Sequence, residues 1–215
     1  MGVGTFYYLQ PDSWKSIEDT ITGMLLVTDA DIIVLLTAAM GVPNEQECIA
    51  VPASAWQSSD PIPPTFEMAL AVALAAVRSP DIISAFAFQM GVVSYSMRGR
   101  YDRASEAIYR PCVGALLAEM SQSCQGTAME IQPEKTMAGI SDIEGKTYFY
   151  VFDSLQTMVE KAMDVMNSPF VRDQFTWLLL NVHLTDFSGQ CLSNPFERVK
   201  NFKTFFHQQK AMPSG

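Results

Sequence analysis

The sequence predicts an all-α protein, one domain of paired amphipathic helices with little β-structure. Two observations favour this class: apolar residues recur every three or four positions over long stretches, and residues that begin or end helices separate those stretches. The chain has 215 residues, of which 48% are hydrophobic and 17% charged, so it can fold around a sizeable core. Because an average soluble domain is ~25% charged, we expect further copies of the chain to cover part of its surface.

A helical hairpin is predicted at residues 12–41. Trp14 and Ile17 begin a run of apolar residues at helical spacing, and Gly41, followed closely by a proline, ends the second apolar stretch. Two helices joined by a short turn form an antiparallel pair. The next segment, residues 48–64, contains four prolines and is predicted to be an extended connector.

A second helical half is predicted at residues 65–184. Its first helix is rich in alanine, which lets helices approach closely, and Ser79 with Pro80 marks a new helix start. A later apolar stripe, from Phe152 to Met166, predicts another helix.

Two segments complete the predicted organisation. Residues 126–145 are expected to form a loop, because glycine, proline and polar residues replace the periodic pattern there. The C-terminal segment, residues 194–215, opens with an Asn-Pro-x-Glu helix start and predicts a final helix. Residues 1–215 are therefore predicted to be a single domain.

The charge pattern leaves two explanations open. A net charge of −9 and an isoelectric point near 4.6 argue against a protein covered in phosphate-binding cations. Lys15 is nevertheless the only cation before a cluster of five arginines, which are Arg78, Arg98, Arg100, Arg103 and Arg110. A solvated helix face with ion pairs to Asp102 and Glu106 would account for the cluster. Contact with a phosphate backbone is the alternative, although charge alone favours the solvated helix face.

The cysteines and the hydropathy pattern predict a cytosolic protein without a membrane span. The four cysteines are widely spaced and include no C-x-x-C, so we expect free thiols in a reducing compartment. The first residues do not match a signal peptide. The longest uncharged stretch, Ile82 to Met97, has 16 residues, fewer than the ~20 that a spanning helix needs.

Common catalytic motifs are absent from the sequence. It contains no nucleotide-binding glycine loop, no G-x-S-x-G and no H-E-x-x-H. His183, Asp186 and Cys191 could form a Cys-His-Asp set, but their spacing gives no reason to expect a catalytic geometry. We therefore predict no enzymatic activity, no cofactor and no metal site.

Several motifs follow the order of those in one known family. They are Phe6-Tyr7-Tyr8-Leu9 with Trp14 and Ile17-Glu18, Trp56 with the proline run to Pro64, Arg78 to Phe88, Tyr150 to Asp153, and Asn194 to Val199. Together they resemble the coat proteins of rod-shaped plant RNA viruses, the tobamovirus-like group. The resemblance implies an antiparallel four-helix bundle, with extra helices or loops, whose copies stack into a helical rod around single-stranded RNA. It also implies location in the virion and the host cytoplasm. Residues 110–145 and 167–193 have no counterpart in that family.

The same resemblance implies a groove that binds RNA. Its candidate residues are Arg98, Gly99, Arg100, Asp102, Arg103 and Asp153. The arginines would neutralise phosphates, the glycine would let the backbone approach closely, and the two aspartates would accept hydrogen bonds from ribose or base edges. The chain departs from the family before Asp153, where Tyr150 and Val151 stand in place of a basic pair.

The surplus of acidic residues suggests pH-sensitive assembly, since like charges at subunit contacts repel one another. The candidate carboxylates are Glu45, Glu47, Glu67, Asp81 and Glu106. Two other functions remain open at this point. One is a non-viral cytosolic helical scaffold or adaptor, and the other is a helical enzyme or a carrier of small apolar ligands.

Overall fold

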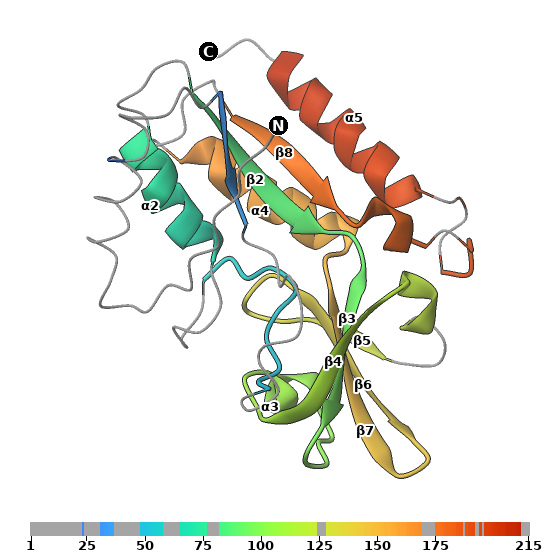
Figure 1. Cartoon of the computed structure of the whole chain (residues 1–215). Helices are drawn as coiled ribbons and strands as arrows, with labels where there is room; N and C mark the ends of the chain where they lie inside the picture. The colour runs from blue at the N-terminus through green and yellow to red at the C-terminus, as the bar shows by residue number, and fades with distance from the viewer. Residues whose placement is uncertain are drawn as a thin grey trace.

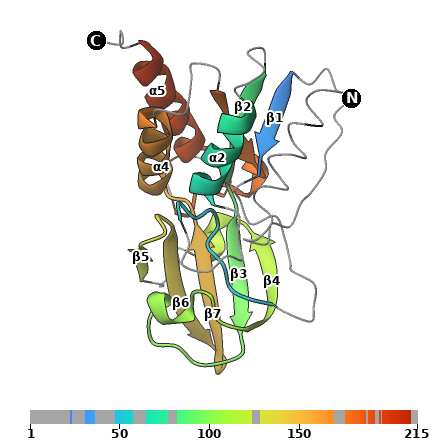
Figure 2. The same cartoon turned by 90° about the vertical axis from the view of Figure 1, so that its left-hand side faces the viewer.

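The chain folds around two β-sheets, so the prediction of an all-α four-helix bundle is wrong. The computed structural model describes residues 23, 31–36, 48–57, 65–76, 82–123, 128–168, 175–186, 188–191, 194 and 196–211. Figures 1 and 2 show one sheet above the other, with the longer helices beside the upper sheet. No helix within the described residues is long and apolar enough to cross a membrane.

The upper sheet is parallel and has three strands in the order β1-β2-β8. Its strands are β1 (Ile32–Leu35), β2 (Ile83–Gln89) and β8 (Phe175–Leu180). Phe86 of β2 lies opposite Leu35 on one side and Trp177 on the other. The sequences ISAFAFQ and FTWLLL are almost continuously apolar, as is typical of strands in a buried parallel sheet.

Three helices accompany this sheet. They are α2 (Phe66–Ala76) between β1 and β2, α4 (Leu155–Asn167) before β8, and α5 (Glu197–Ala211) after it. The order strand, helix, parallel strand is that of β/α units. Ser154 caps α4, because its side chain accepts a hydrogen bond from the backbone N–H of Thr157 at 3.2 Å.

The lower sheet is antiparallel and is inserted between β2 and α4. Its five strands have the order β4-β3-β7-β6-β5. They are β3 (Val92–Met97), β4 (Cys112–Ala118), β5 (Met129–Ile131), β6 (Met137–Ile143) and β7 (Lys146–Phe152). A short helix, α3 (Ala104–Ala107), lies in the β3–β4 connection. Glu144 and Gly145 both have positive φ angles, 52° and 77°, and make the tight turn of the β6–β7 hairpin.

An aromatic core joins the parallel sheet to its helices. The ring centroid of Phe88 lies 5.0 Å from that of Phe66 on α2, 5.4 Å from that of Trp177 and 5.3 Å from that of Phe202 on α5. The opposite face of this sheet is partly open, because Ile32 and Val34 are 51% and 44% exposed. The described helices therefore cover one face of the sheet.

A second core holds the antiparallel sheet to the segment that precedes α2. Tyr95 and Phe149 stack with their centroids 6.1 Å apart, and the Tyr95 hydroxyl donates to the carbonyl of Val51 at 3.1 Å. Cys48 and Cys112 form a disulfide that fastens the segment to β4. The prediction of free thiols is wrong for both residues, and Cys191 is disulfide-bonded as well.

The secondary-structure predictions fail where apolar residues are continuous. The helices expected near residues 66–76, 155–167 and 197–211 are confirmed. Part of the predicted hairpin, Ile32–Leu35, is a strand, and the rest lies outside the described residues except Gly23, Asp31 and Leu36. The stretch 82–97, expected to be helical, forms β2 and β3, and the expected loop at 126–145 contains β5 and β6. An uninterrupted apolar run does not distinguish a buried strand from a buried helix.

Candidate functional site

The carboxyl edge of the parallel sheet is the candidate site, because ligands of α/β proteins bind where parallel strands end. At this edge Gln89 ends β2 and lies opposite Leu180, the last residue of β8. The buried Gln89 carboxamide oxygen accepts hydrogen bonds from the Asn181 side-chain amide at 3.1 Å and from the backbone N–H of Gly91 at 3.2 Å. Two carboxamides from neighbouring strands are thus joined at the edge.

Both carboxamide positions are set by the local backbone. Asn181 has a positive φ of 52°, a conformation that asparagine adopts more readily than most residues, and it turns the chain into the 3-10 helix η3 (Val182–Leu184). At Gly91 a Cβ atom would lie only 3.0 Å from side-chain atoms of Leu117 and Leu184 and 3.1 Å from the Ala118 carbonyl oxygen. A larger residue at this position would therefore require its neighbours to shift by a few tenths of an ångström.

Below the edge lies a buried ionic cluster. The Lys161 ammonium group donates to the Ser54 carbonyl oxygen at 2.7 Å and to its hydroxyl at 2.8 Å, and it forms an ion pair with Asp153. The Ser54 hydroxyl also donates to the Asp153 carboxylate. Burial lowers the pKa of Lys161, and the negative charge of Asp153 opposes that shift.

A buried arginine extends this cluster to the carboxyl edge. The Arg198 guanidinium donates to the backbone carbonyls of Asp153 and Met90 and, at 3.2 Å, to the Thr185 hydroxyl. Burial lowers the pKa of Arg198 to about 10. The arginine therefore ties α5 to the ends of β2 and β7 and to the turn after β8.

The carboxylates around the edge are occupied by structural hydrogen bonds. Asp186 is buried, and its two oxygens accept the backbone N–H groups of Gln190 and Cys191, each at 3.0 Å. A Glu119 oxygen accepts the backbone N–H of Ser188 at 2.8 Å, and Asp153 is held by Lys161. Each of these three carboxylates therefore accepts at least one hydrogen bond or ion pair within the protein. The described residues contain no group of three or more His, Cys, Asp or Glu that could hold a metal ion.

The structure places five of the six predicted RNA-binding residues together and the sixth apart. Arg98, Gly99, Arg100, Asp102 and Arg103 are exposed between β3 and α3, at the end of the antiparallel sheet away from the carboxyl edge. The Arg98 side chain donates to the Cys112 carbonyl at 3.0 Å. Asp153 is fully buried in the ionic cluster instead.

The residues of the possible Cys-His-Asp set do not form a catalytic group in the structure. His183 is exposed, Asp186 is buried, and Cys191 has no free thiol because it is disulfide-bonded. Of the candidate assembly carboxylates, Glu67 and Glu106 are exposed on α2 and α3. Glu45, Glu47 and Asp81 lie outside the described residues.

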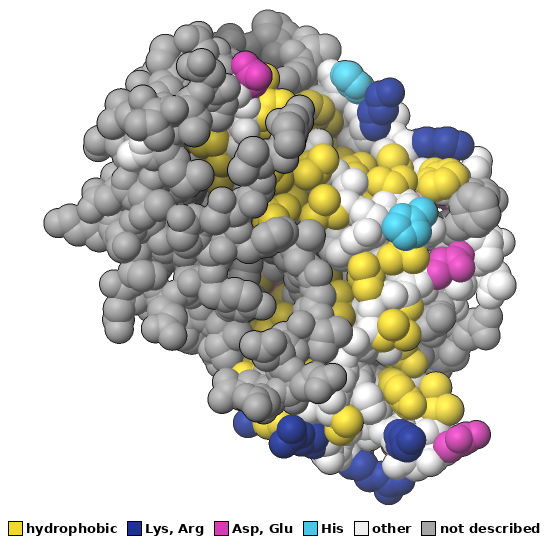
Figure 3. Space-filling view, viewed as in Figure 1, with side chains coloured by type: hydrophobic (Ala, Val, Ile, Leu, Met, Phe, Trp, Pro, Cys, Tyr) yellow, Lys and Arg dark blue, Asp and Glu magenta, His cyan; other side chains and the backbone are white. Residues whose placement is uncertain are grey.

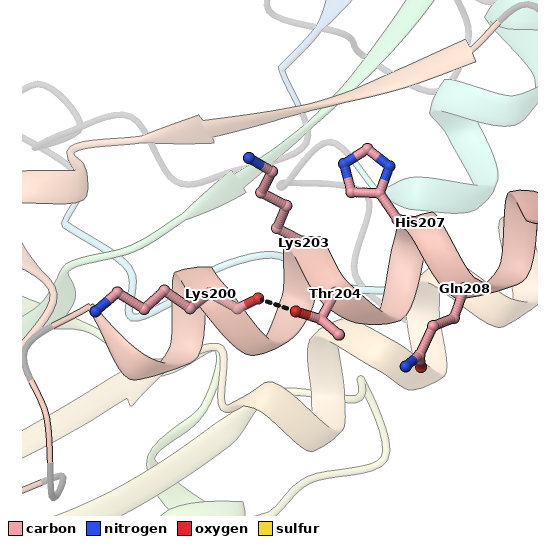
Figure 4. A pocket seen from close by; sticks show the side chains of 5 residues that line it. All are labelled: Lys200, Lys203, Thr204, His207 and Gln208. Atoms are coloured by element: carbon pink, nitrogen blue, oxygen red, sulfur yellow. Dashed lines mark hydrogen bonds between the residues drawn. The ribbon is translucent and has the colours of Figure 1, made fainter.

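A shallow depression on α5 carries no site. It is lined by Lys200, Lys203, Thr204, His207 and Gln208. Figure 4 shows that all five side chains come from one helix and that Thr204 donates back to the Lys200 carbonyl, at 3.0 Å. No second element encloses a ligand in this view.

Comparison with known proteins identifies the fold but not the family. No family model matches the chain, and no curated protein matches its sequence. Solved structures do match. The chitinase-like agglutinin of Robinia pseudoacacia has a TM-score of 0.51 at 12% identity, over 69% of this chain and 41% of the agglutinin. A family GH18 chitinase of Cycas revoluta, solved with allosamidin, has a TM-score of 0.54 at 13% identity, over 81% and 47%.

A bacterial enzyme has the same fold. The family GH18 N-acetylglucosaminidase of Paenibacillus barengoltzii has a TM-score of 0.53 at 12% identity, over 78% of this chain and 48% of that one. The chain therefore has a chitinase-like α/β fold, and it spans about half the length of these structures. Structures of this fold include both enzymes and an agglutinin.

These matches correct the functional predictions. The resemblance to tobamovirus-like coat proteins is wrong, and with it the capsid function, the helical assembly around single-stranded RNA, and the location in virion and host cytoplasm. The alternative of a helical scaffold has no support either. The resemblance rested on short motifs such as Phe-Glu before an apolar helix. Motifs of this length occur by chance in proteins of several folds, so they do not identify a family.

Sequence reasoning missed Gln89 and Asn181. The signal that could have found them is a polar carboxamide directly after an apolar run, in ISAFAFQ and in FTWLLLN. Interpreting those runs as strands would have placed both residues at one sheet edge.

Proposed function

We propose that the chain is a chitinase-like lectin that binds oligosaccharides containing N-acetylglucosamine at the carboxyl edge of its parallel sheet and does not hydrolyse them. The observation that carries the proposal is the chemistry of this edge, where carboxamides from β2 and β8 meet while the nearby carboxylates are occupied. Asn181 is the proposed contact residue, and the buried Gln89 positions it.

Three considerations support this proposal. A carboxamide offers both a donor and an acceptor, as the hydroxyl and acetamido groups of such sugars require. Matching structures include an agglutinin and chitinases solved with sugar-like ligands or with N-acetylglucosamine oligomers. The disulfides favour an oxidising compartment such as the cell exterior, where polysaccharides of this kind are encountered.

The test measures binding and hydrolysis side by side. Isothermal titration with (GlcNAc)4 should show binding, while chromatography of the same mixture after long incubation should show no shortened product. We expect the Asn181→Gly variant to bind about three- to tenfold more weakly, because one hydrogen-bonding side chain is lost. Glycine is chosen because it tolerates the positive φ at this position.

An asparagine elsewhere provides the control. Asn201 is exposed on α5, and Asn201→Gly should leave affinity for (GlcNAc)4 unchanged. Its thermal unfolding is followed too, since glycine weakens a helix. Absence of binding by the unmodified chain would refute the proposed lectin, and product release above that of a protein-free sample would make it a hydrolase.

A further inference from the structure

The connection between β3 and β4 gathers arginines at the end of the antiparallel sheet away from the carboxyl edge. We call residues 98–110 the arginine tip. Its arginines are Arg98, Arg100, Arg103 and Arg110, and all four are exposed. The tip holds four of the fourteen Lys and Arg residues of the chain but only two of its twenty-three Asp and Glu residues. Figure 3 shows Lys and Arg side chains gathered at the lower end of the molecule, where Figure 1 places α3.

Two of the guanidinium groups are held at the base of the tip. The Nε atom of Arg98 donates to the Cys112 carbonyl at 3.0 Å, and that of Arg110 donates to the Glu106 carbonyl at 3.4 Å. The backbone N–H of Arg98 also donates to the Pro111 carbonyl at 3.3 Å, which brings the two ends of the tip together. Within the described residues these side-chain bonds use Nε alone. The terminal nitrogen atoms are thus available to an oxyanion, which a guanidinium group can bind through two parallel hydrogen bonds.

The charges of the arginine tip are not neutralised within the described residues. Asp102 and Glu106 lie in the same connection, and helical spacing would allow them to pair with the arginines. In this connection only Ala104–Ala107 is helical, so that spacing is not realised. No described carboxylate forms an ion pair with any of the four guanidinium groups. An anionic partner would therefore meet charges that the fold leaves unpaired.

The rest of the molecule confines such a partner to the tip. The chain has a net charge of −9, so most of its surface repels a polyanion. The β6–β7 hairpin lies at the same end of the sheet and carries Lys146 together with Asp142 and Glu144. Because the hairpin adds no positive excess, the favourable contact belongs to the arginine tip.

Two observations favour a polysaccharide as the carrier of the negative charge. Tyr101, next to Arg100 in the tip, is half-buried and lies over Gly99, where a Cβ atom would be 3.3 Å from the Tyr101 hydroxyl. A tyrosine beside arginines offers a rigid ring to the face of a sugar and guanidinium groups to its acidic substituents. The disulfides favour an oxidising compartment such as the cell exterior, where acidic polysaccharides are encountered.

We infer that the arginine tip is a second binding surface, for an anionic polysaccharide that carries sulfate or carboxylate groups along its chain. The tip lies across the length of the antiparallel sheet from the carboxyl edge, and the inference does not depend on the proposed lectin function. Its arginines pair with successive oxyanions of the polymer. Binding should weaken steeply as the salt concentration rises, because dissolved ions screen these charges and compete for them.

Dextran sulfate and polygalacturonate are the probes, and uncharged dextran is the control polymer. Biolayer interferometry at about 50 mM NaCl should show binding of the unmodified chain to at least one acidic polymer and none to dextran. The polymer that binds more tightly identifies the preferred oxyanion as sulfate or carboxylate.

The test variant is Arg100→Gln with Arg103→Gln. Neither side chain has a partner among the described residues, so the fold should be unaffected. We expect the affinity for the tighter polymer to fall about tenfold, because two ionic contacts are lost. The slope of log affinity against log salt concentration should fall by about one to two for the same reason.

The control variant removes the same charge elsewhere. Lys200 and Lys203 are exposed on α5, and Lys200→Gln with Lys203→Gln should leave the affinity for the acidic polymer within about twofold. Both double variants should keep the unmodified affinity for (GlcNAc)4, because neither changes the carboxyl edge.

The outcomes separate this inference from the proposed function. Absence of binding to both acidic polymers would overturn the inference. Equal losses in the two double variants would also overturn it, since contact would then follow overall charge. Tighter binding to vesicles containing phosphatidylserine, or to poly(U), than to either polysaccharide would assign the tip to another partner. A chain that binds dextran sulfate through the tip but does not bind (GlcNAc)4 would lose the lectin function and keep the arginine tip.

Discussion

The two sheets of this chain are stabilised by different means. The parallel sheet packs one apolar face on helices through a cluster of aromatic rings, and a fully buried Lys161–Asp153 pair lies at its border. The antiparallel sheet packs one core around Tyr95 and Phe149 and a second around Tyr150 and Phe152, and the Cys48–Cys112 disulfide fastens it to the preceding segment. Both regions therefore depend on apolar burial, to which the first adds a buried ion pair and the second a covalent link.

This difference bears on how each region can carry function. The strands of the parallel sheet direct aromatic side chains at the helices. The polar side chains that we propose to bind a ligand follow these strands, at the carboxyl edge. The strands of the antiparallel sheet place buried side chains on both faces, around Phe149 on one and around Tyr150 on the other.

The largest expected effect comes from the buried ion pair. Lys161→Met removes one partner and leaves the Asp153 carboxylate buried without its counter-ion, so we expect the free energy of unfolding to fall by about 3–5 kcal/mol. Urea denaturation followed by far-ultraviolet circular dichroism measures this loss.

An exposed pair of the same residue types is the matched control. Lys135 and Asp164 also form an ion pair, but their side chains are 29% and 36% exposed. Lys135→Met should cost at most about 1 kcal/mol, because exposed pairs are screened by water and salt. Equal losses in the two variants would show that burial does not distinguish the pairs.

A smaller effect is expected from the disulfide. Replacing both partners, in Cys48→Ser with Cys112→Ser, opens a loop of 64 residues, and the loss of a disulfide typically costs about 2–4 kcal/mol. Hydrogen exchange should show lost protection mainly in β3 and β4, with the β2–β8 pairing retained. Uniform loss of protection in both sheets would mean that the link stabilises the whole molecule and not one region.

The smallest expected effect is a dependence of the free energy of unfolding on pH, which arises from Tyr95 in the antiparallel sheet. Burial raises the pKa of the Tyr95 phenol above its ordinary value, so the unfolded chain releases this proton first. The stability contributed by the protonated phenol is present below about pH 10 and is lost as the pH rises further. Burial acts oppositely on Arg198, whose lowered pKa makes stability rise with pH over part of the same range.

Comparison with a variant isolates the tyrosine contribution. Between about pH 9 and 11, the melting temperature of the unmodified chain should fall more steeply than that of Tyr95→Phe. At neutral pH the variant should lose about 0.5–1.5 kcal/mol, the worth of its hydrogen bond to Val51. Parallel melting curves across this range would exclude Tyr95 as the titrating group.

Local signals in the sequence predicted some elements and not others. The sequence predicts helices at α4 and α5, and both are confirmed. The start expected at Asn194 is wrong, because Phe196 has a positive φ of 61° and α5 begins at Glu197. The strands β2 and β8 lie where the sequence predicts the second helical half, because an apolar run alone does not distinguish a buried strand from a buried helix. The β6–β7 hairpin was missed although Gly145 sits between two strands with β-type composition.

The candidate site could not be predicted from the sequence, because its residues meet only through contacts between distant parts of the chain. Asp153 was singled out, but as an exposed contact, whereas its partners determine a buried role. Ser54 lies 107 residues from Lys161 along the chain, and nothing local to either residue indicates that they meet. The disulfide depended likewise on two Cα atoms coming within 5.0 Å.

By itself, the sequence determined that this is an acidic, strongly apolar chain with several capped helices, because composition and helix starts act over a few residues. Tertiary structure alone decided that the apolar runs become strands, that two carboxamides share one edge, and that a lysine, an aspartate and a serine share one buried cluster. Those outcomes depend on contacts between residues far apart in the chain, and such contacts exist only once the two sheets have formed.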